Sequence, residues 1–358
     1  MKEKILITTG GSGGHVIPAL SFYEHLNENY DVYLASDLRG SKFIDKEIYK
    51  NKIIDVPDIK KNILKVPLNI IFFLISIIKS FIYLKKNKIS KIISTGGYMT
   101  LPICIASRFT KSKLFLFEPN MVLGRSNKLF LKTSKKIFCY SDKIKNYPKK
   151  YKDKIFLIEP LLRKEFYSTD IVQKPEIEKK INLLIIGGSQ GAQFFETILK
   201  NTIIKLSNRY KVKIIQQLNI SNFDNLKKFY YNNNIEYEFF DFDKNILKYI
   251  SQSNLCITRA GSSTLSELTF LNIPYIAIPL PSAKDNHQLK NAIFYEERNC
   301  CWLLNQDEIN DDILFNKISN IIDNKEDYLI KKKNMKKFCY QNTWNNINQK
   351  LIKIINEN

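Results

Sequence analysis

Short apolar runs rich in β-branched residues recur along the whole chain, separated by segments long enough to form helices. One series of runs falls at 4–9, 31–36, 91–96, 114–119, 136–141 and 155–160, and a second at 182–188, 213–218, 236–242, 254–259, 275–280 and 301–304. Continuous apolar runs of this length predict buried parallel strands, with the connecting helices on both faces of the sheet. The two series therefore predict an α/β fold with two doubly wound domains.

The length of 358 residues is consistent with two domains, and the polar stretch 167–181 is the predicted linker. A hydrophobic content of 44% and an aromatic content of 12% exclude a disordered chain. The first residues, MKEKILITTGG, run directly into a predicted strand, so no signal peptide is expected. The six cysteines show no CxxC spacing and are predicted to be reduced thiols of a cytosolic protein.

The net charge of +21 favours anionic partners: nucleic acid, anionic lipid or phosphorylated substrates. A compositional drift of the genome toward Lys, Ile and Asn is an equally good explanation of this charge. No nucleic-acid recognition motif is found, so no nucleic-acid partner is expected.

The segment Val66–Lys86 is the most apolar helix candidate. Pro67, Asn69 and Lys79 interrupt it, which argues against a membrane span. Two interpretations stay open: a buried crossover helix, and a helix that dips into an anionic bilayer with a basic rim. The rim would consist of Lys60, Lys61, Lys65, Lys85, Lys86, Lys88 and Lys91.

The first run ends in the loop GGSGGH, Gly10 to His15, which opens a helix. Glycines leave backbone N–H groups uncovered, and a helix N-terminus attracts an anion. The loop therefore predicts a phosphate or pyrophosphate site beside His15, a candidate general base. Two alternatives stay open: a dinucleotide-binding turn with Asp37 as the ribose acid, although the G-x-G-x-x-G spacing is not met, and a turn without a ligand.

The second series opens with a similar loop, GGSQGA, Gly187 to Ala192, and one substrate for each domain would explain both loops. A further turn, RAGSST at 259–264, also opens a helix and suits a diphosphate. Glu267 follows one turn later, where it either accepts the two hydroxyls of a ribose or closes a capping box with Thr264. The cluster DNHQLKN at 285–291 has the amide and carboxylate groups typical of a sugar site.

The motifs GGSGGHVIPAL, TGGYMT, EPN…GRSNK, GGSQGA, RAGSSTLSE and PLPSAKDNHQLKNA resemble, in order and spacing, those of the MurG family of membrane-associated N-acetylglucosaminyltransferases. The resemblance implies the GT-B fold, in which two Rossmann-like domains face a cleft. It implies an acceptor domain at 1–163, with a C-terminal helix from about 335 to 358 packed back on it, and a donor domain at 164–334.

The resemblance also implies roles for individual residues. His15 and Glu118 are the candidate catalytic residues, and Gly13, Gly14, Tyr98 and Asn127 are expected to bind the acceptor. The expected donor-binding residues are Ser12, Gly13, Asn120, Arg163, Ser189, Gln217, Phe240, Ser262, Ser263, Thr264, Glu267, His287, Gln288 and Asn291. Among them, Phe240 corresponds to the position whose backbone reads uracil, and Glu267 to the ribose acid.

The implied reaction is an inverting transfer of GlcNAc from UDP-GlcNAc to the MurNAc C4 hydroxyl of lipid I (undecaprenyl-pyrophosphoryl-MurNAc-pentapeptide), which gives lipid II for peptidoglycan. The expected location is the cytoplasmic face of the bacterial inner membrane, as a peripheral protein in contact with anionic lipids. No metal site and no required cofactor are expected, and a Mg²⁺ ion held loosely by the diphosphate stays open. The rivals are a UDP-GlcNAc 2-epimerase or another GT-B sugar-nucleotide enzyme and, in a different class, a basic membrane- or nucleic-acid-binding protein without catalysis.

Overall fold

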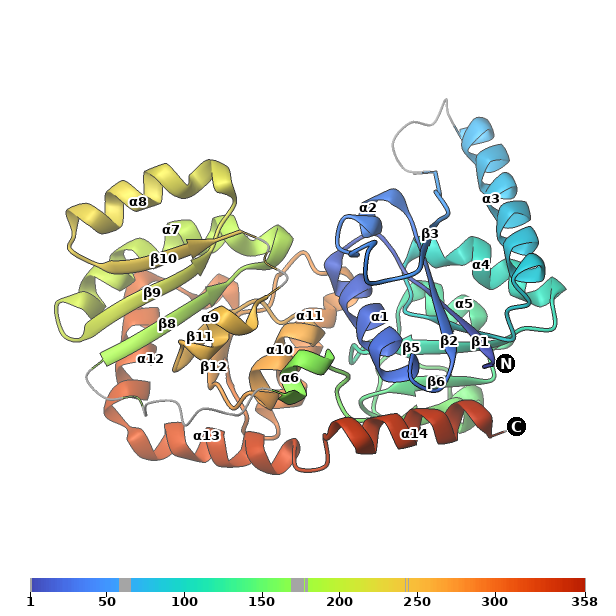
Figure 1. The fold of residues 1–358 in the computed structure, drawn as a ribbon. Helices are drawn as coiled ribbons and strands as arrows, with labels where there is room; N and C mark the ends of the chain where they lie inside the picture. Colours follow the sequence, from blue (N-terminus) through green and yellow to red (C-terminus); the bar gives the residue numbers. More distant parts are fainter. Residues whose placement is uncertain are drawn as a thin grey trace. The chain divides into compact units, whose positions relative to one another are not determined.

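The computed structural model describes residues 2–57, 66–168, 177, 180–241, 243 and 245–357, and for residues 189–192 it describes the backbone alone. The chain divides into two compact units, residues 1–167 with 342–358, and residues 168–341 (Figure 1). The boundaries expected from the sequence, after 163 and at about 335, differ from these by a few residues.

The first unit is built on a parallel sheet with the order β3-β2-β1-β4-β5-β6-β7. Its strands are β1 (Lys4–Thr8), β2 (Asp31–Ser36), β3 (Asn51–Ile53), β4 (Lys91–Ser94), β5 (Lys113–Glu118), β6 (Lys136–Cys139) and β7 (Ile155–Leu157). Its helices are α1 (Gly13–Leu26), α2 (Leu38–Ser41), α3 (Val66–Lys86), α4 (Leu101–Ala106), α5 (Arg125–Phe130) and α14 (Trp344–Asn356), with 3₁₀ turns η2 (Tyr98–Thr100), η3 (Ser107–Phe109) and η4 (Lys149–Lys154). Helix α6 (Lys164–Ser168) lies at the boundary of the unit.

The second unit is built on a parallel sheet with the order β10-β9-β8-β11-β12-β13. Its strands are β8 (Lys180–Ile186), β9 (Lys211–Gln217), β10 (Glu236–Phe240), β11 (Leu255–Thr258), β12 (Tyr275–Ala277) and β13 (Trp302–Leu303). Its helices are α7 (Gly188–Ser207), α8 (Phe223–Asn232), α9 (Leu247–Ser251), α10 (Ser262–Phe270), α11 (His287–Glu296), α12 (Asp311–Asp323) and α13 (Lys325–Phe338), with 3₁₀ turns η5 (Ile220–Asn222), η6 (Lys284–Asn286) and η7 (Gln306–Glu308).

The prediction of two doubly wound parallel sheets is confirmed, and the expected apolar runs all correspond to strands. The sequence missed β3, because its three residues, NKI, are too few and too polar to stand out as an apolar run. Of the predicted linker, residues 169–176 and 178–179 lie outside the described residues, and β8 already begins at Lys180.

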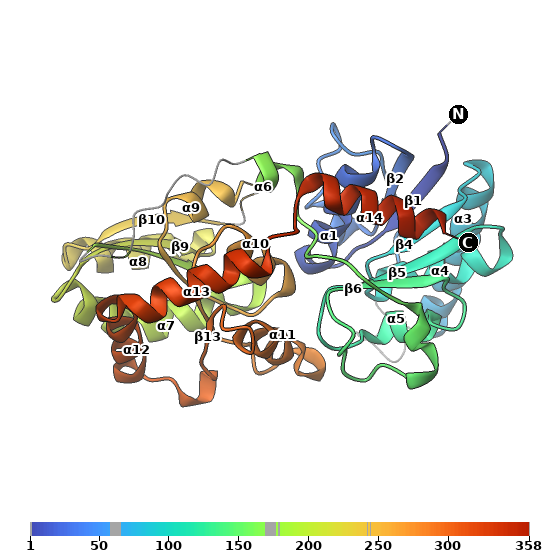
Figure 2. The same cartoon turned by 90° about the horizontal axis from the view of Figure 1, so that it is seen from below.

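Successive residues of β1 face opposite layers of the first unit. Ile5 and Ile7 pack with α1 and α14 in one cluster, whereas Leu6 packs with α4 and the end of α3 in another. Figure 2 shows α14 running along the same side of the sheet as α1. The C-terminal helix therefore completes one face of the first unit, which would otherwise expose the apolar side of its strands.

Two buried lysines fix the C-terminal end of α14. Lys136 donates to the carbonyl of Ile354 at 3.0 Å, and Lys91 donates to the side chain of Asn356 at 2.8 Å. A cation at a helix C-terminus is favoured by the helix dipole. Lys91 is 5% exposed and also pairs with Glu3 at 2.6 Å, so its predicted place in a basic membrane rim is wrong.

His25 connects three segments that are far apart in the sequence. On α1, its ring stacks on Trp344 with the centroids 3.9 Å apart and lies against the side-chain amide of Asn348. Its Nε2 lies 3.0 Å from the carbonyl oxygen of Leu162. Burial lowers the pKa of His25 to about 4, so the ring is neutral at physiological pH.

Acidification is expected to destabilise the first unit through His25. In the unfolded chain the pKa is about 6.5, so between that pH and about 4 the unfolded state binds more protons than the folded state. The free energy of unfolding should therefore fall by about 2 kcal/mol between pH 7 and pH 5 from this group alone. Chemical unfolding of the full chain at both pH values, for wild type and His25→Gln, isolates this contribution. Equal pH dependence in the two proteins would contradict it.

Candidate functional site

The glycine loops of the first unit follow β1 and β4, the neighbouring strands between which the strand order reverses. Ligands bind at this point of a doubly wound sheet, beyond the carboxyl ends of the strands. Gly10 and Gly11 have φ of 154° and 82°, and Gly96 and Gly97 have φ of 83° and 84°. A Cβ at Gly10 would lie 2.6 Å from Oδ1 of Asp37, so the first loop has no room for a side chain at this position.

The side chain of Asp37 fixes the first loop, Gly10 to His15, by a hydrogen bond to its backbone. Its Oδ1 accepts hydrogen bonds from the N–H of Gly11 at 2.8 Å and of Gly40 at 2.9 Å, and its Oδ2 pairs with Arg39 at 3.1 Å. The residue is 2% exposed. The role of ribose acid considered for Asp37 is therefore wrong, since both of its oxygens are used inside the protein.

His15 lies in the first turn of α1, directly after Gly13 and Gly14. The cap residue Ser12 makes no side-chain cap, so the N–H groups of the first turn are not satisfied from that side chain. The Nδ1 of His15 lies 3.0 Å from the carbonyl oxygen of Thr95. A carbonyl only accepts, so the proton of the neutral ring is on Nδ1 and the basic lone pair is on Nε2.

Glu118 ends β5 and organises the loop that follows it. Its carboxylate accepts from the N–H of Gly124 at 2.7 Å and from the side-chain amides of Asn120 and Asn127, each at 3.0 Å. Burial raises the pKa of Glu118, and these hydrogen bonds oppose that rise. Because Glu118 is 3% exposed and its oxygens are occupied, it is built to position the loop.

Asn127 and Tyr98, two further predicted residues of the first unit, lie beside these loops. Asn127 is buried and also donates to the carbonyl of Phe117 at 2.9 Å, next to Gly96. Tyr98 begins η2 directly after Gly97. Arg163 lies further away in the chain, before α6, where its guanidinium pairs with Glu165 at 2.7 Å.

The loops of the second unit follow β8 and β11, where the strand order again reverses. Gly188 has φ of 63°, and its N–H donates to the side-chain oxygen of Gln217 at 3.0 Å. Ser189 lies in the first turn of α7, and its side chain is outside the described part. Phe240 is buried and stacks on Tyr249 with the centroids 3.8 Å apart, while its carbonyl accepts from Leu218 at 2.8 Å.

Helix α10 begins earlier than the capping-box alternative requires. Gly261 is the cap residue, and Ser262, Ser263 and Thr264 form the first turn. Thr264 is therefore inside the helix, and its predicted role as a cap is wrong. Glu267 lies one turn further along α10 and is 8% exposed.

The cluster on α11 holds the chain just before that turn. The side-chain oxygen of Gln288 accepts from the N–H groups of Ala260 at 3.2 Å and Leu280 at 2.9 Å, and Asn291 donates to the carbonyl of Ala260 at 3.2 Å. His287 lies at the start of α11, with Nδ1 2.8 Å from the carbonyl oxygen of Lys284. Gln288 and Asn291 thus fix the position of Gly261 through its neighbour.

Arg259 is a buried charged residue beside the predicted diphosphate turn, and the sequence did not single it out as a candidate. It is 5% exposed, and its guanidinium donates to the carbonyls of Ile278 and Pro279 at 3.2 Å and to the side chain of Gln306 at 2.7 Å. Burial lowers the pKa of this guanidinium to about 10, so it stays charged at neutral pH. No carboxylate pairs with it among the described residues. Its place at the start of RAGSST, in a chain where arginine is scarce, was the signal available.

The sequence matches two domain families that together cover most of the chain. Residues 5–139 match the glycosyltransferase family 28 N-terminal domain, and residues 182–349 match the glycosyltransferase family 28 C-terminal domain. The chain is 56% identical, over the whole length of both proteins, to the UDP-N-acetylglucosamine–N-acetylmuramyl-(pentapeptide) pyrophosphoryl-undecaprenol N-acetylglucosamine transferase of Pelagibacter ubique (strain HTCC1062). It is 35% identical to the transferase of the same name from Rickettsia canadensis (strain McKiel), over 90% of this chain and 91% of that protein.

The chain belongs to the MurG family of glycosyltransferases. The crystal structure of MurG from Acinetobacter baumannii superposes with a TM-score of 0.74, 20% identity and 99% coverage of both chains. The UDP-GlcNAc 2-epimerase of Neisseria meningitidis superposes with a TM-score of 0.65, 13% identity and coverage of 98% and 100%. These matches show the GT-B fold, and the epimerase considered from the sequence shares the fold alone.

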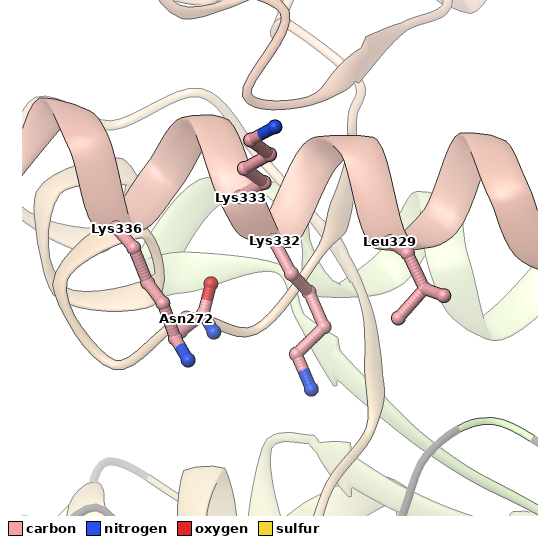
Figure 3. Close-up of a pocket in the computed structure, with 5 residues that line it drawn as sticks. All are labelled: Asn272, Leu329, Lys332, Lys333 and Lys336. Atoms are coloured by element: carbon pink, nitrogen blue, oxygen red, sulfur yellow. The ribbon is translucent and has the colours of Figure 1, made fainter.

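The second unit has a surface pocket of about 320 Å³ that includes none of the glycine-loop residues of this MurG-family chain. It is lined by Asn272, Leu329, Lys332, Lys333 and Lys336. Figure 3 shows Lys332 and Lys336 extending from α13 on the side of Asn272, whereas Lys333 points to the other side. None of the predicted donor-binding residues lines this pocket.

Helix α3 carries an exposed apolar face. By length and composition alone it could cross a membrane, and 11% of its most apolar stretch is buried. The exposed face consists of Leu68, Ile70, Ile71, Phe72, Leu74, Ile75, Ile78 and Ile82, each 38–58% exposed. The buried-crossover alternative is therefore wrong. Of the predicted basic rim, Lys85, Lys86 and Lys88 are exposed near its C-terminal end, and Lys60, Lys61 and Lys65 lie outside the described residues.

Replacing Glu118 by Gln is expected to loosen the loop after β5, because an NH₂ group would face N–H donors that now share a carboxylate. Leaving one such donor unsatisfied lowers the free energy of unfolding by about 1–3 kcal/mol. Transferase activity should fall, with the pH dependence of kcat/KM unchanged, because the residue positions the loop. Unfolding curves and pH–rate profiles measure both effects.

The control is Glu159→Gln, which weakens a partly exposed pair with Lys350 and should cost less than about 1 kcal/mol. A shifted pH–rate profile for Glu118→Gln would instead make Glu118 the general base.

Proposed function

We propose that this protein transfers GlcNAc from UDP-GlcNAc to the MurNAc C4 hydroxyl of lipid I and so makes lipid II. The observation that carries the proposal is the 56% identity, over the full length of both chains, to the transferase of Pelagibacter ubique. The geometry of the two loop systems supports it, because each unit offers a helix N-terminus that suits a phosphate group.

In the proposed mechanism His15 is the general base. Its Nδ1 proton is engaged by Thr95, so Nε2 is the atom that removes the proton from the acceptor hydroxyl. The deprotonating hydroxyl attacks the anomeric carbon from the face opposite UDP, and the C–O bond to UDP breaks with inversion. General base catalysis of this kind contributes about 10²–10⁴-fold to the rate. Gly13 and Gly14 bring the N-terminus of α1 to the lipid pyrophosphate.

On the donor side, the departing UDP gathers negative charge on its diphosphate. The N-terminal turn of α10, at Ser262, Ser263 and Thr264, stabilises that charge, and buried Arg259 adds a full positive charge nearby. Glu267 accepts the ribose hydroxyls, and the cluster on α11 binds the sugar while it holds Ala260. No resident metal or cofactor takes part in this proposal, and a Mg²⁺ ion bound to the diphosphate stays an alternative.

Incubation with labelled UDP-GlcNAc and lipid I should give a labelled lipid product, and His15→Ala should lower its rate by at least tenfold, up to about 10⁴-fold. The dissociation constant for UDP-GlcNAc should change little, because His15 belongs to the acceptor loop. Product chromatography and a donor-binding titration measure the two quantities.

His287→Ala is the matched comparison, since it should weaken donor binding instead. Epimerised UDP-sugar without lipid product would favour the epimerase, and neither product would favour a binding protein.

We further propose that the protein works as a peripheral protein at the cytoplasmic face of the inner membrane, with α3 as its lipid contact. Moving exposed apolar side chains from water into lipid lowers the free energy of the system. The lysines at the end of α3 suit anionic lipid head groups. The acceptor, lipid I, has to be reached at the same surface.

Replacing Ile71, Leu74 and Ile78 together by Gln should weaken binding to anionic vesicles by at least tenfold, since each removes an exposed apolar side chain from the lipid contact. Vesicle flotation measures the binding, and thermal unfolding should change little because each of these residues is more than half exposed. The control Ile220→Gln removes a similarly exposed isoleucine, 69% exposed on η5. Unchanged flotation of the triple variant would remove α3 as the contact.

A further inference from the structure

One aromatic contact joins α3 to the loop that follows β4. Phe73 stacks on Tyr98 with the ring centroids 5.9 Å apart and the planes at 25°. Phe73 is half-buried and lies on the same side of α3 as Ile77 and Ser80, one and two turns further along. It therefore belongs to the inner face of a helix whose outer face is apolar and exposed.

The segment that ends in Tyr98 also holds His15. The carbonyl of Thr95 lies 3.0 Å from Nδ1 of His15. The position of a Cβ on Gly97 would be 3.2 Å from Cδ2 and 3.3 Å from Nε2 of His15, so the imidazole lies directly against this backbone. The carbonyl of Gly97 is in turn held by the hydroxyls of Thr100 and Ser126, each at 3.0 Å.

The inner face of α3 is otherwise narrow. Only Ser76, Ser80 and Leu84 of this helix are buried among the described residues. Ser76 donates to the carbonyl of Asp55 at 2.8 Å, and Ile77 and Phe81 pack on the cluster that contains α4. Among the contacts that the described residues of α3 make with α4, Asp55 and Tyr98, the Phe73–Tyr98 contact is the one that leads to His15.

We propose that Phe73 is a positioning residue that couples the contact of α3 with a lipid surface to the segment Thr95–Tyr98 that holds His15. This inference rests on the proposed transferase function. Lipid contact restricts the motion of α3, and the stacked ring of Phe73 then restricts Tyr98. The backbone at Gly97, next to Tyr98, fixes the position of the imidazole of His15. The enzyme is then faster when α3 lies on a membrane than when the same reaction takes place in water.

The test compares two rates for each protein. One rate uses lipid I in anionic vesicles, and the other uses a short-chain, water-soluble lipid I analogue without vesicles. The proteins are wild type, Phe73→Leu, Phe73→Tyr and the matched control Phe81→Leu, which makes the same change at a half-buried position two turns further along α3. Vesicle flotation, thermal unfolding and the UDP-GlcNAc dissociation constant are measured for each protein.

Phe73→Leu should lower kcat on vesicles by about two- to tenfold, the loss expected for one aromatic pair. Its rate on the soluble analogue, its flotation and its donor affinity should stay close to those of wild type, so that the vesicle-to-soluble ratio falls. Phe73→Tyr should keep the ratio because the ring is retained. Phe81→Leu should also keep it, even where it lowers the melting temperature.

An unchanged ratio in Phe73→Leu would overturn the inference while leaving the transferase function in place. An equal fall in both rates, in step with the melting temperature, would also overturn it, because the role would then be structural. Failure of wild type to make any labelled lipid would overturn the proposed function itself, and the inference with it.

Amide hydrogen exchange of the wild-type protein tests the same coupling, and this test does not depend on whether a variant folds. The N–H of Thr100, which bonds to the carbonyl of Gly97 at 3.3 Å, should exchange more slowly when anionic vesicles are added. Exchange unaffected by vesicles, in a protein that floats with them, would contradict the coupling.

Discussion

Buried carboxylates that accept backbone N–H groups are the constraint on which the first unit depends. Asp37 is 2% and Glu118 3% exposed, and a polar side chain so far from water is tolerated only when its oxygens are hydrogen-bonded. The loops therefore have to close around them. A Cβ at Gly10 would come within 2.6 Å of Asp37, and one at Gly124 within 2.9 Å of Glu118. The glycines are thus required by the approach of backbone to carboxylate as much as by the approach of a ligand.

The second unit solves the same problem with neutral side chains. Gln217 holds Gly188, and Gln288 and Asn291 hold Ala260, all through amide groups. An amide fixes a loop through its neutral donor and acceptor groups, without burying a carboxylate. Two charged residues next to these loops are buried in the described part of the unit, Arg259 at 5% and Glu267 at 8% exposure. Both units therefore fix their loops through buried side chains that bind backbone groups, with carboxylates in the first unit and amides in the second.

Much of this could be read from the sequence because it is local. Apolar runs marked the strands, and glycines after them marked the loops at the carboxyl edge of each sheet. Partners distant in the chain could not be read: nothing at His25 indicates Asn348, and nothing at Gln288 indicates that it binds the backbone of Ala260. Both residues were recognisable as polar groups in a motif or a helix, but the sequence does not say whether such a group faces a ligand or the neighbouring loop.

Helix α3 shows a different limit of prediction from sequence. The spacing of apolar residues indicates that a helix forms, but it does not indicate which face of the helix packs on the protein. Here the inner face includes two serines, Ser76 and Ser80, whose hydroxyls bond to backbone carbonyls, while isoleucines and leucines face outward. Small side chains let α3 pack closely on the first unit, whereas the large ones on its outer face are 38–58% exposed in the described part of the chain. An apolar face of this size in water is unfavourable, and contact with lipid removes the cost. Phe73 lies on the inner face together with Ile77 and Phe81 and stacks on Tyr98, so the helix proposed to face the lipid is also in contact with the segment that holds His15.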